Sequence, residues 1–385
     1  MKLCYILPKL NRSNAENFFH IRNFLSELGK FIDVHLIVEN SDEKKPIIQN
    51  IQSITILSYN NNKSLLKRSL RLIWAFFKLQ KSGVRLFFGR SSLTGTFPVA
   101  LINRLVNFNK SRVLFWSCGQ DIVPISYKPS IENFKRIFLK ILFRLNIKLI
   151  NYLVTGPEEM VNYYSSFYNI KPLKIINLPN DISLQRFFPL DAASKLDLKK
   201  KLFNTDKKII LYVHTFNLSR GANILPIIAK NIVDRKIDAL VIAIGRPGDY
   251  SKELDKQISI LKLEERLINI GQVPNKDIMK YYQVSDLFIM PSLGEGFPRV
   301  VIESMATGCP VVSYDVGGVK SILPQEYLNR QLISVGDQNA FIESALCLVQ
   351  DNDLLSKISN VSLKKVNNFS TEKVAQKYFR VLASL

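Results

Sequence analysis

Short apolar runs alternate along the chain with longer segments in which apolar residues recur every three or four positions. Such runs are typical of strands buried on both faces, and such segments are typical of helices that cover a sheet. The predicted strands are 2–7, 33–38, 51–57, 85–88, 112–116 and 152–155, then 208–213, 239–244, 267–270, 287–290, one beginning at 311, and 332–335. This alternation predicts the α/β class, and 385 residues are enough for two doubly wound domains.

One predicted strand–loop–helix–strand unit, residues 285–318, has a helix entrance suited to a ligand. Pro298 fits the first position of a helix because its missing N–H is not needed there, and Gly308 fits the end. The first N–H groups of a helix have no partner inside it and lie at its positive end, so the entrance is an anion site. Gly296 leaves room for a ligand to approach the backbone.

Two carboxylates flank this entrance, Glu295 just before the helix and Glu303 between one and two turns inside it. Carboxylates accept hydrogen bonds from sugar and ribose hydroxyls, so the unit predicts a site for a nucleoside diphosphate that carries a sugar. The alternative is an ordinary unit with a solvated Glu at a helix start. The two acids occur together with Gly-Glu-Gly, Phe-Pro and, at 317–318, Gly-Gly, and this combination favours the ligand site.

The motif Pro-Ser-x-x-Glu-Gly-Phe-Pro-x-x-x-x-Glu-x-Met-Ala-x-Gly-x-Pro-Val-Val, which contains Glu295-x7-Glu303, resembles the signature of family 4 retaining glycosyltransferases of the GT-B fold, the glycosyl transferases group 1. The resemblance is strong over 205–325 and weak over 1–185. It implies two Rossmann-like doubly wound domains that face a cleft, with a nucleotide sugar bound in it. It also implies a C-terminal helix that crosses back to the first domain.

The resemblance also implies residue roles. Glu295 and Arg220 are the candidate catalytic residues, with Glu295 holding the hydroxyls of the donor sugar and Arg220 the diphosphate. The donor-binding candidates are Glu303, Gly296, Phe297, Pro298, Thr215, Arg246, Gly271 and Val273. No metal and no cofactor are expected, because the nucleotide-diphosphate sugar is itself the donor substrate.

Some positions depart from the pattern of this family. Thr215 stands where the family has an Arg, and Arg220 stands where it has a Lys, so one phosphate cation is missing unless a basic group elsewhere replaces it. Ser321 stands where a Glu is common, and the loop 9–14 contains no Gly. These departures motivate a second hypothesis, a degenerate member that binds nucleotide sugar or membrane without transferring the sugar.

Charge adds a further expectation. The formal net charge is +21, and residues 61–150 contain seventeen Lys and Arg against two acids, Asp121 and Glu132. Such a field attracts anionic surfaces, whether nucleic acid, anionic lipid or phosphorylated substrates. Because no nucleic-acid-binding motif accompanies the charge, nucleic acid is not expected as a partner.

The segments 62–82 and 130–150 each combine apolar residues, such as Leu70 and Trp74, with a basic side. The basic residues are Lys63, Lys67, Arg71 and Lys78 in the first segment and Lys135, Arg136, Lys140, Arg144 and Lys148 in the second. This combination is typical of interfacial membrane helices, and the alternative is a core-facing helix with a solvated basic face. Two such helices favour an anionic membrane surface as a partner and a lipid-linked glycan or polysaccharide as the acceptor.

The predicted domains are an N-terminal Rossmann-like acceptor and membrane-facing domain (1–188), a C-terminal Rossmann-like nucleotide-sugar-binding domain (205–370) and a final helix (371–385). The polar, Lys-rich stretch 190–207 is predicted as the linker. No stretch reaches the roughly 18 consecutive apolar residues of a spanning helix, and neither a signal peptide nor paired cysteines are evident. These features predict a cytoplasmic enzyme, peripheral on the inner face of the cell membrane.

Overall fold

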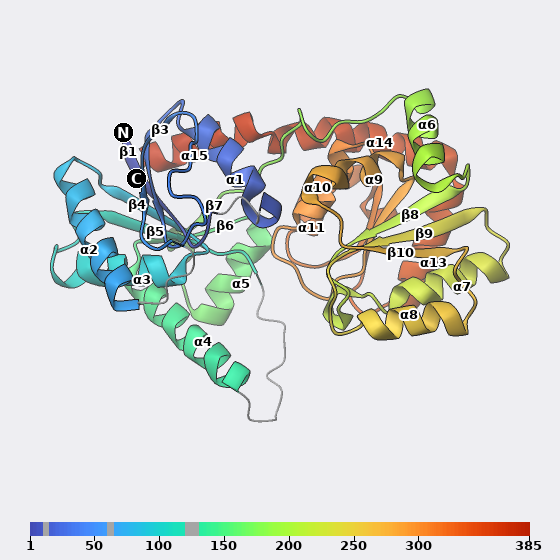
Figure 1. Cartoon of the computed structure of the whole chain (residues 1–385), viewed down its shortest axis with the longest axis horizontal. Coiled ribbons are helices and arrows are strands. Elements are labelled where there is room, and N and C mark those ends of the chain that lie inside the picture. The colour runs from blue at the N-terminus through green and yellow to red at the C-terminus, as the bar shows by residue number, and fades with distance from the viewer. Residues whose placement is uncertain (11–14, 60–64, 120–130) are drawn as a thin grey trace. The chain divides into compact units, whose positions relative to one another are not determined.

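The computed structural model of the chain describes residues 1–10, 15–59, 65–119 and 131–385. The chain folds into two compact units, each of which Figure 1 shows as a sheet with helices around it. Of the described residues, the first contains Met1–Cys118, 131–181 and Thr371–Leu385, and the second contains Gly119 and Ile182–Ser370. Each unit is built around one parallel sheet with helices, which confirms the predicted α/β class.

The first unit has a seven-stranded sheet in the order β3-β2-β1-β4-β5-β6-β7, in which all neighbours are parallel. Its strands are β1 (Lys2–Leu7), β2 (Asp33–Val38), β3 (Ile51–Ile56), β4 (Leu86–Arg90), β5 (Arg112–Trp116), β6 (Tyr152–Thr155) and β7 (Ile175–Asn177). The strand order reverses between β1 and β4, as in a doubly wound sheet.

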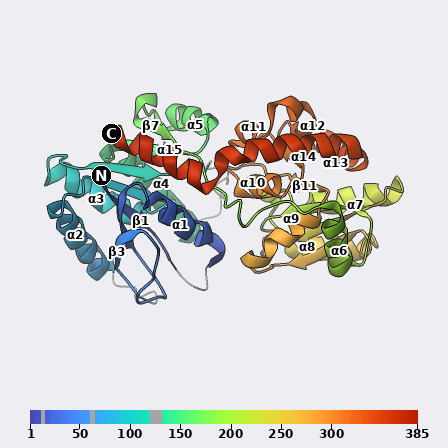
Figure 2. The same ribbon diagram turned by 90° about the horizontal axis from the view of Figure 1, so that it is seen from above.

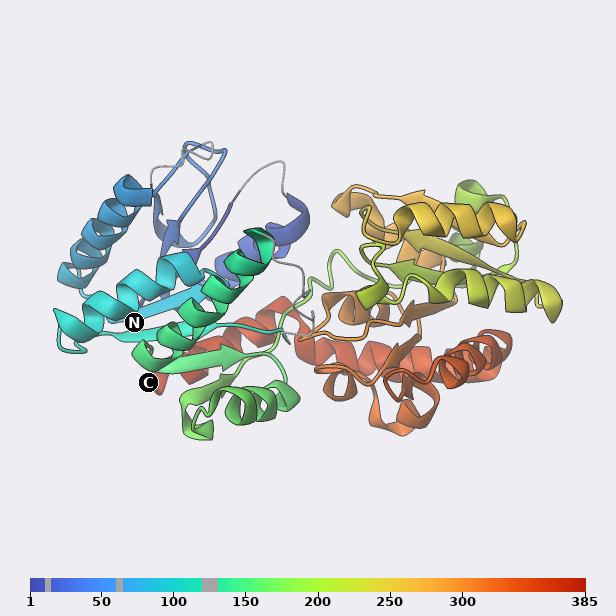
Figure 3. The ribbon, with the colours of Figure 1, turned by 90° about the horizontal axis from the view of Figure 1, so that it is seen from below.

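Helices cover both faces of this sheet, and each face has its own apolar core. The helices are α1 (Ala15–Leu28), α2 (Leu65–Lys81), α3 (Leu93–Leu105), α4 (Ile131–Leu149), α5 (Glu158–Tyr168) and α15 (Thr371–Ala383). Residues of α2 to α5 pack on one face around Phe76, Phe87 and Phe115, and Figure 3 shows α2, α3 and α4 next to one another. Residues of α1 and α15 pack on the other face.

The last helix returns to the first unit, as predicted. Val374, Tyr378 and Leu382 recur at helical spacing and are buried in the same core as α1, beside which α15 lies in Figure 2. At the start of α15, Thr371 Oγ1 donates to Asp181 Oδ2 at 2.8 Å. This bond joins the two points at which the chain leaves the first unit and re-enters it.

The predicted linker at 190–207 is wrong. The two units part between Asp181 and Ile182, and most of the predicted linker forms helix α6 (Ala192–Phe203) inside the second unit. Two lysines of α6, Lys195 and Lys199, contact Asp286, an acid far along the chain. Lys199 Nζ donates to Asp286 Oδ2 at 2.8 Å, and this ammonium group is buried.

The second unit has a six-stranded sheet in the order β10-β9-β8-β11-β12-β13, again with all neighbours parallel. The strands are β8 (Lys208–Val213), β9 (Ala239–Ile244), β10 (Leu267–Gly271), β11 (Leu287–Met290), β12 (Val311–Tyr314) and β13 (Leu332–Ile333). Here the strand order reverses between β8 and β11. Open α/β sheets bind their ligands at the carboxyl ends of the strands, at such a reversal.

The helices of the second unit, in addition to α6, lie on both sides of its sheet. They are α7 (Ile224–Asp234), α8 (Ser251–Ile260), α9 (Ile278–Val284), α10 (Arg299–Ala306), α11 (Val319–Ile322), α12 (Leu328–Gln331), α13 (Gln338–Gln350) and α14 (Asn352–Val366). In Figure 1, α9, α10 and α14 lie on one side and α7, α8 and α13 on the other. Within the described parts of the chain, no helix has the length and apolar character needed to span a bilayer.

Candidate functional site

The central motif lies at the strand reversal of the second unit. The strands β8 and β11 are neighbours, and the segments that follow them, 214–221 and 291–298, leave from the same edge of the sheet. Two backbone hydrogen bonds join this edge. The Leu293 N–H donates to the Ser219 carbonyl at 3.0 Å, and the Gly318 N–H, beyond β12, donates to the Gly296 carbonyl at 2.7 Å. The sheet therefore brings together the motif and the predicted diphosphate loop.

Glu295 is the centre of this arrangement. Arg220 Nη1 lies 2.5 Å from Glu295 Oε1 and also donates to the Gly294 carbonyl at 2.6 Å. His214 Nε2 lies 3.3 Å from the same carboxylate oxygen, and the Glu295 side chain is only 13% exposed. Burial acts to raise the pKa of Glu295, but the contacts with His214 and Arg220 outweigh it and hold this pKa below its usual value. The side chain is therefore a carboxylate at neutral pH.

Two glycines permit this close packing. Gly221 has φ +71°, and a Cβ there would come within 2.2 Å of the Pro291 carbonyl oxygen. Gly317 has φ +53°, and a Cβ there would come within 2.3 Å of the Glu295 carbonyl oxygen. A side chain at either position would be strained and would push apart the segments that hold Glu295.

The helix entrance differs in detail from the prediction. Helix α10 begins at Arg299, so Pro298 is the residue before its first turn and not the first helical residue. The Phe297 ring is buried and packs edge-on against Phe369, with 5.7 Å between ring centroids. Gly296 is buried, and its carbonyl accepts the bond from Gly318. Phe297 and Gly296 are thus packing residues in this structure.

Glu303 lies on α10, near the side chains of Arg299, Arg186 and Tyr282. Burial raises the pKa of Glu303 above its usual value, and the two guanidinium groups oppose the rise. Arg186 in turn donates from Nη2 to Asn275 Oδ1 at 2.7 Å. Asn275 begins the short helical turn that follows β10, so Arg186 bridges this turn and the surroundings of Glu303.

The remaining predicted residues lie on the same sheet edge. The Thr215 N–H donates to His214 Nδ1, and the Thr215 side chain carries no charge. Arg246 follows β9, and its carbonyl accepts from the Phe216 N–H at 3.0 Å, while its side chain is exposed. The Gly271 carbonyl at the end of β10 accepts from Gly245 N–H at 2.9 Å, and Val273 is half-buried two residues beyond.

His214 is the residue of this site to which sequence reasoning assigned no role. It directly follows β8, a strand whose bounds the apolar pattern predicts correctly. A histidine in the first position after a strand at the sheet reversal is a usable signal, because such positions face the ligand edge of α/β sheets. Only the folded chain shows that its ring meets Glu295.

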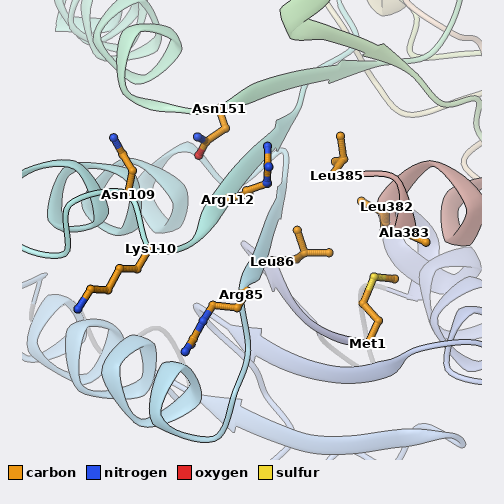
Figure 4. Close-up of a pocket in the computed structure, with 10 residues that line it drawn as sticks. All are labelled: Met1, Arg85, Leu86, Asn109, Lys110, Arg112, Asn151, Leu382, Ala383 and Leu385. Carbon is orange, nitrogen blue, oxygen red and sulfur yellow. The ribbon is translucent and has the colours of Figure 1, made fainter.

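A cavity of about 580 Å³ lies elsewhere, in the first unit (Figure 4). Its lining includes Arg85, Lys110, Arg112 and, from the C-terminal segment, Leu382 and Leu385. It lies where β4 and β5 begin, at the amino ends of the strands, whereas ligands of parallel sheets bind at the carboxyl ends. The cavity is therefore no part of the candidate site. Among the described residues, no group of three or more His, Cys, Asp or Glu could hold a metal ion.

Comparison with known proteins identifies the class. Residues 194–365 match the family model described as "Glycosyl transferases group 1". The chain is 26% identical over 356 residues to the UDP-Gal:alpha-D-GlcNAc-diphosphoundecaprenol alpha-1,3-galactosyltransferase of Escherichia coli, covering 90% of this chain and 87% of that protein. It is 20% identical over 326 residues to the alpha-monoglucosyldiacylglycerol synthase of Streptococcus pneumoniae, covering 79% and 73%.

Among solved structures, HepE of Anabaena in complex with UDP superposes with a TM-score of 0.78 over the full length of both chains, at 16% identity. At that identity the likeness shows the fold alone, which is the predicted GT-B fold of two Rossmann-like units. Family match, relatives and fold together define the protein as a glycosyltransferase. The region that matches the glycosyl transferases group 1 model lies in the second unit and contains the motif around Glu295 and Glu303.

Proposed function

We propose that the protein is a retaining glycosyltransferase that moves a sugar from a nucleotide-diphosphate sugar to a lipid-linked or polysaccharide acceptor in cell-surface glycan synthesis. The observation that carries this proposal is the meeting of Arg220 and Glu295 at the strand reversal, next to the start of α10. A fixed cation and helix N–H groups stabilise the negative charge that develops on a departing diphosphate. Glu295 would then accept bonds from the donor sugar, and Glu303 from the ribose.

The names of two relatives support the choice of substrates. One relative is named for a UDP-linked donor and a diphosphoundecaprenol-linked acceptor, and another for synthesis of a glycolipid. Arg220 supplies the charge that a metal ion would otherwise supply to the leaving group, so we propose a metal-independent reaction. The acceptor would be bound by the first unit.

The direct test is transfer from a panel of UDP-, GDP-, ADP- and dTDP-sugars to a diphosphopolyprenol-linked glycan, with and without EDTA. We expect transfer with one of these donors, unchanged by EDTA, and NMR of the product should show the anomeric configuration of the donor. Binding of a nucleotide sugar without transfer to any acceptor would favour the degenerate-member hypothesis. An inverted anomer would refute the retaining mechanism.

Glu303 provides a prediction for the donor site. Glu303→Ala should weaken binding of the nucleotide by about 1–3 kcal/mol, because a hydrogen bond between a charged group and the ribose is lost. Isothermal calorimetry with the nucleoside diphosphate that the parent binds would measure this change. Glu326→Ala, at an exposed position of the same unit, is the control. Unchanged affinity in a folded Glu303→Ala protein would remove Glu303 from the site.

The first unit carries a surface suited to a lipid-linked acceptor. Helix α2 buries Leu72, Phe76 and Leu79 in the core, whereas Leu70 and Trp74 are 58% and 61% exposed. Leu70 and Trp74, two of the predicted apolar residues of this helix, thus point outward, whereas Phe77 packs against the core. Lys78 Nζ lies 4.8 Å from the centre of the Trp74 ring, but Arg71 is bound to the Leu57 carbonyl, and Lys63 lies outside the described residues.

Helix α4 repeats this arrangement, with Phe143 and Ile147 packed inward. Its exposed apolar residues are Ile137, Phe138, Leu139, Ile141 and Leu145, and its basic residues include Lys140, Arg144 and Lys148. The side chains of Lys135 and Arg136 lie outside the described set. Exposed apolar and basic side chains together match the interface of an anionic membrane, which supports a peripheral membrane location.

The combined variant Lys140→Gln, Arg144→Gln and Lys148→Gln tests this location. Each basic residue near an anionic surface contributes about 1 kcal/mol, so the partition onto vesicles should fall by roughly a hundredfold. Co-sedimentation with phosphatidylcholine vesicles, with and without phosphatidylglycerol, measures the partition. Only the anionic vesicles should discriminate between variant and parent.

The matched control is Lys252→Gln, Lys256→Gln and Lys262→Gln, which removes three exposed lysines from the second unit. It should leave vesicle binding close to that of the parent. Equal co-sedimentation of the two triple variants with anionic vesicles would refute the membrane proposal. Both variants should bind the nucleotide as the parent does.

A further inference from the structure

His214 has a defined hydrogen-bonding pattern. The Thr215 N–H donates to Nδ1 at 2.8 Å, so Nδ1 is an acceptor and the ring hydrogen lies on Nε2. Nε2 lies 3.3 Å from Glu295 Oε1, within reach of a weak hydrogen bond. The backbone of the chain's own diphosphate loop therefore sets the tautomer, and the ring presents an N–H donor to the site.

Two donors converge on one oxygen. Arg220 Nη1 and His214 Nε2 both contact Glu295 Oε1, one through a full positive charge and the other through a neutral N–H group. The Glu295 side chain is largely shielded from water, so both interactions act in a low-dielectric place. A carboxylate oxygen held in this way stands in for an anionic phosphoryl oxygen, which accepts hydrogen bonds from the same kinds of donor.

The loop also explains why a second donor is needed. Thr215 places no cation in the site, and Arg220 is bound to Glu295 and to the Gly294 carbonyl. The ring of His214, the residue before Thr215, lies beside Glu295 and carries an Nε2–H group that can serve as this second donor.

We propose that His214 Nε2–H and Arg220 form the pair that binds the diphosphate of the donor, and that Glu295 occupies this pair in the unliganded protein. This inference rests on the proposed function, because it assigns a second contact to the same donor. When the donor binds, a phosphoryl oxygen replaces Glu295 Oε1 on both N–H groups. The released carboxylate is then free to accept bonds from the donor sugar. Binding of the diphosphate and positioning of Glu295 become one coupled event.

Two substitutions distinguish the hydrogen-bond donor role of His214 Nε2 from the packing role of the ring. In His214→Asn, the amide oxygen can still accept from the Thr215 N–H, but no donor reaches the place of Nε2. In His214→Gln, the amide nitrogen reaches that place. Calorimetry measures the affinity of each variant for a nucleoside diphosphate and for the corresponding uncharged nucleoside. The nucleoside diphosphate is the one among UDP, GDP, ADP and dTDP that the parent binds.

We expect His214→Asn to weaken nucleoside diphosphate binding by roughly ten- to a hundredfold, as for a hydrogen bond to a charged group. His214→Gln should recover most of this loss, and nucleoside binding should be unchanged in both. His35→Asn, the same change in the first unit, is the matched control. Parent-like diphosphate binding in His214→Asn, or equal losses in the Asn and Gln variants, would overturn the proposal.

A double-mutant cycle with Glu295→Gln tests the occupied state. Removing the carboxylate should tighten diphosphate binding in the parent, and this gain should shrink in the His214→Asn background because the two residues are coupled. An equal gain in both backgrounds would show a general charge effect and refute the shared site. If the parent binds none of the four nucleoside diphosphates, the proposed function fails. A failure confined to the His214 variants refutes only this inference.

Discussion

Arg220→Ala is expected to lower the rate of sugar transfer by roughly 10²–10³-fold, the usual loss when one preorganised donor to a developing negative charge is removed. Arg220 carries the guanidinium charge at this site, and Thr215 adds none. The start of α10 supplies N–H groups but no full charge. Binding of the uncharged nucleoside should change little, because Arg220 acts on the diphosphate.

Arg220→Lys should recover only part of the rate, since an ammonium group cannot bond two oxygens in the fixed geometry of a guanidinium group. Arg235→Ala is the matched control, because Arg235 pairs with Glu343 on the surface of the same unit. Such exposed pairs contribute little. Near-parent turnover in Arg220→Ala would show that the diphosphate is held elsewhere.

Asp286→Ala is expected to destabilise the second unit by about 3–5 kcal/mol, the usual cost of breaking a buried ion pair. The Asp286 carboxylate accepts from Lys199 Nζ at 2.8 Å, from Lys195 Nζ at 3.0 Å and from the Ile209 N–H at 2.9 Å. The Lys199 side chain is only 6% exposed. The substitution leaves this ammonium group buried without its partner and loosens α6 from the sheet.

The Asp286 carboxyl group also predicts that the stability of the fold depends on pH. Burial acts to raise the pKa of Asp286, but Lys195 and Lys199 outweigh it and hold this pKa below its usual value. A carboxyl group whose pKa is lower in the folded than in the unfolded chain stabilises the fold above its unfolded pKa of about 3.9. That stability is lost as the pH falls through the lower, folded pKa. In Asp286→Ala this acid-dependent contribution should be absent.

The stability of the second unit should be measured from its unfolding transition by calorimetry or circular dichroism. The two tryptophans, Trp74 and Trp116, both lie in the first unit, so their fluorescence does not report on the second. Asp206→Ala, which removes a carboxylate with 70% exposure beside Lys200, should change stability by less than about 1 kcal/mol. A similarly small effect of Asp286→Ala would mean that α6 does not depend on this ion pair.

The sequence by itself determined the elements whose signals are local. The apolar runs at 2–7, 33–38 and 208–213 predict β1, β2 and β8 with their observed bounds, because a strand buried on both faces must be apolar along its length. The motif from Glu295 to Glu303 identified the class of enzyme, which the comparisons confirm. Its spacing is a property of one helix and its preceding loop, so no distant partner was needed to recognise it.

Tertiary structure alone decided which polar residues have partners. The stretch 190–207 has the composition of a linker, yet it forms helix α6, and Lys199 of this helix pairs with Asp286, a residue far along the chain. His214 looked like an isolated histidine until the pairing of β8 with β11 brought its ring to Glu295. Local propensity describes a segment in water, whereas burial and ion pairing depend on residues that only the assembled sheet brings into contact.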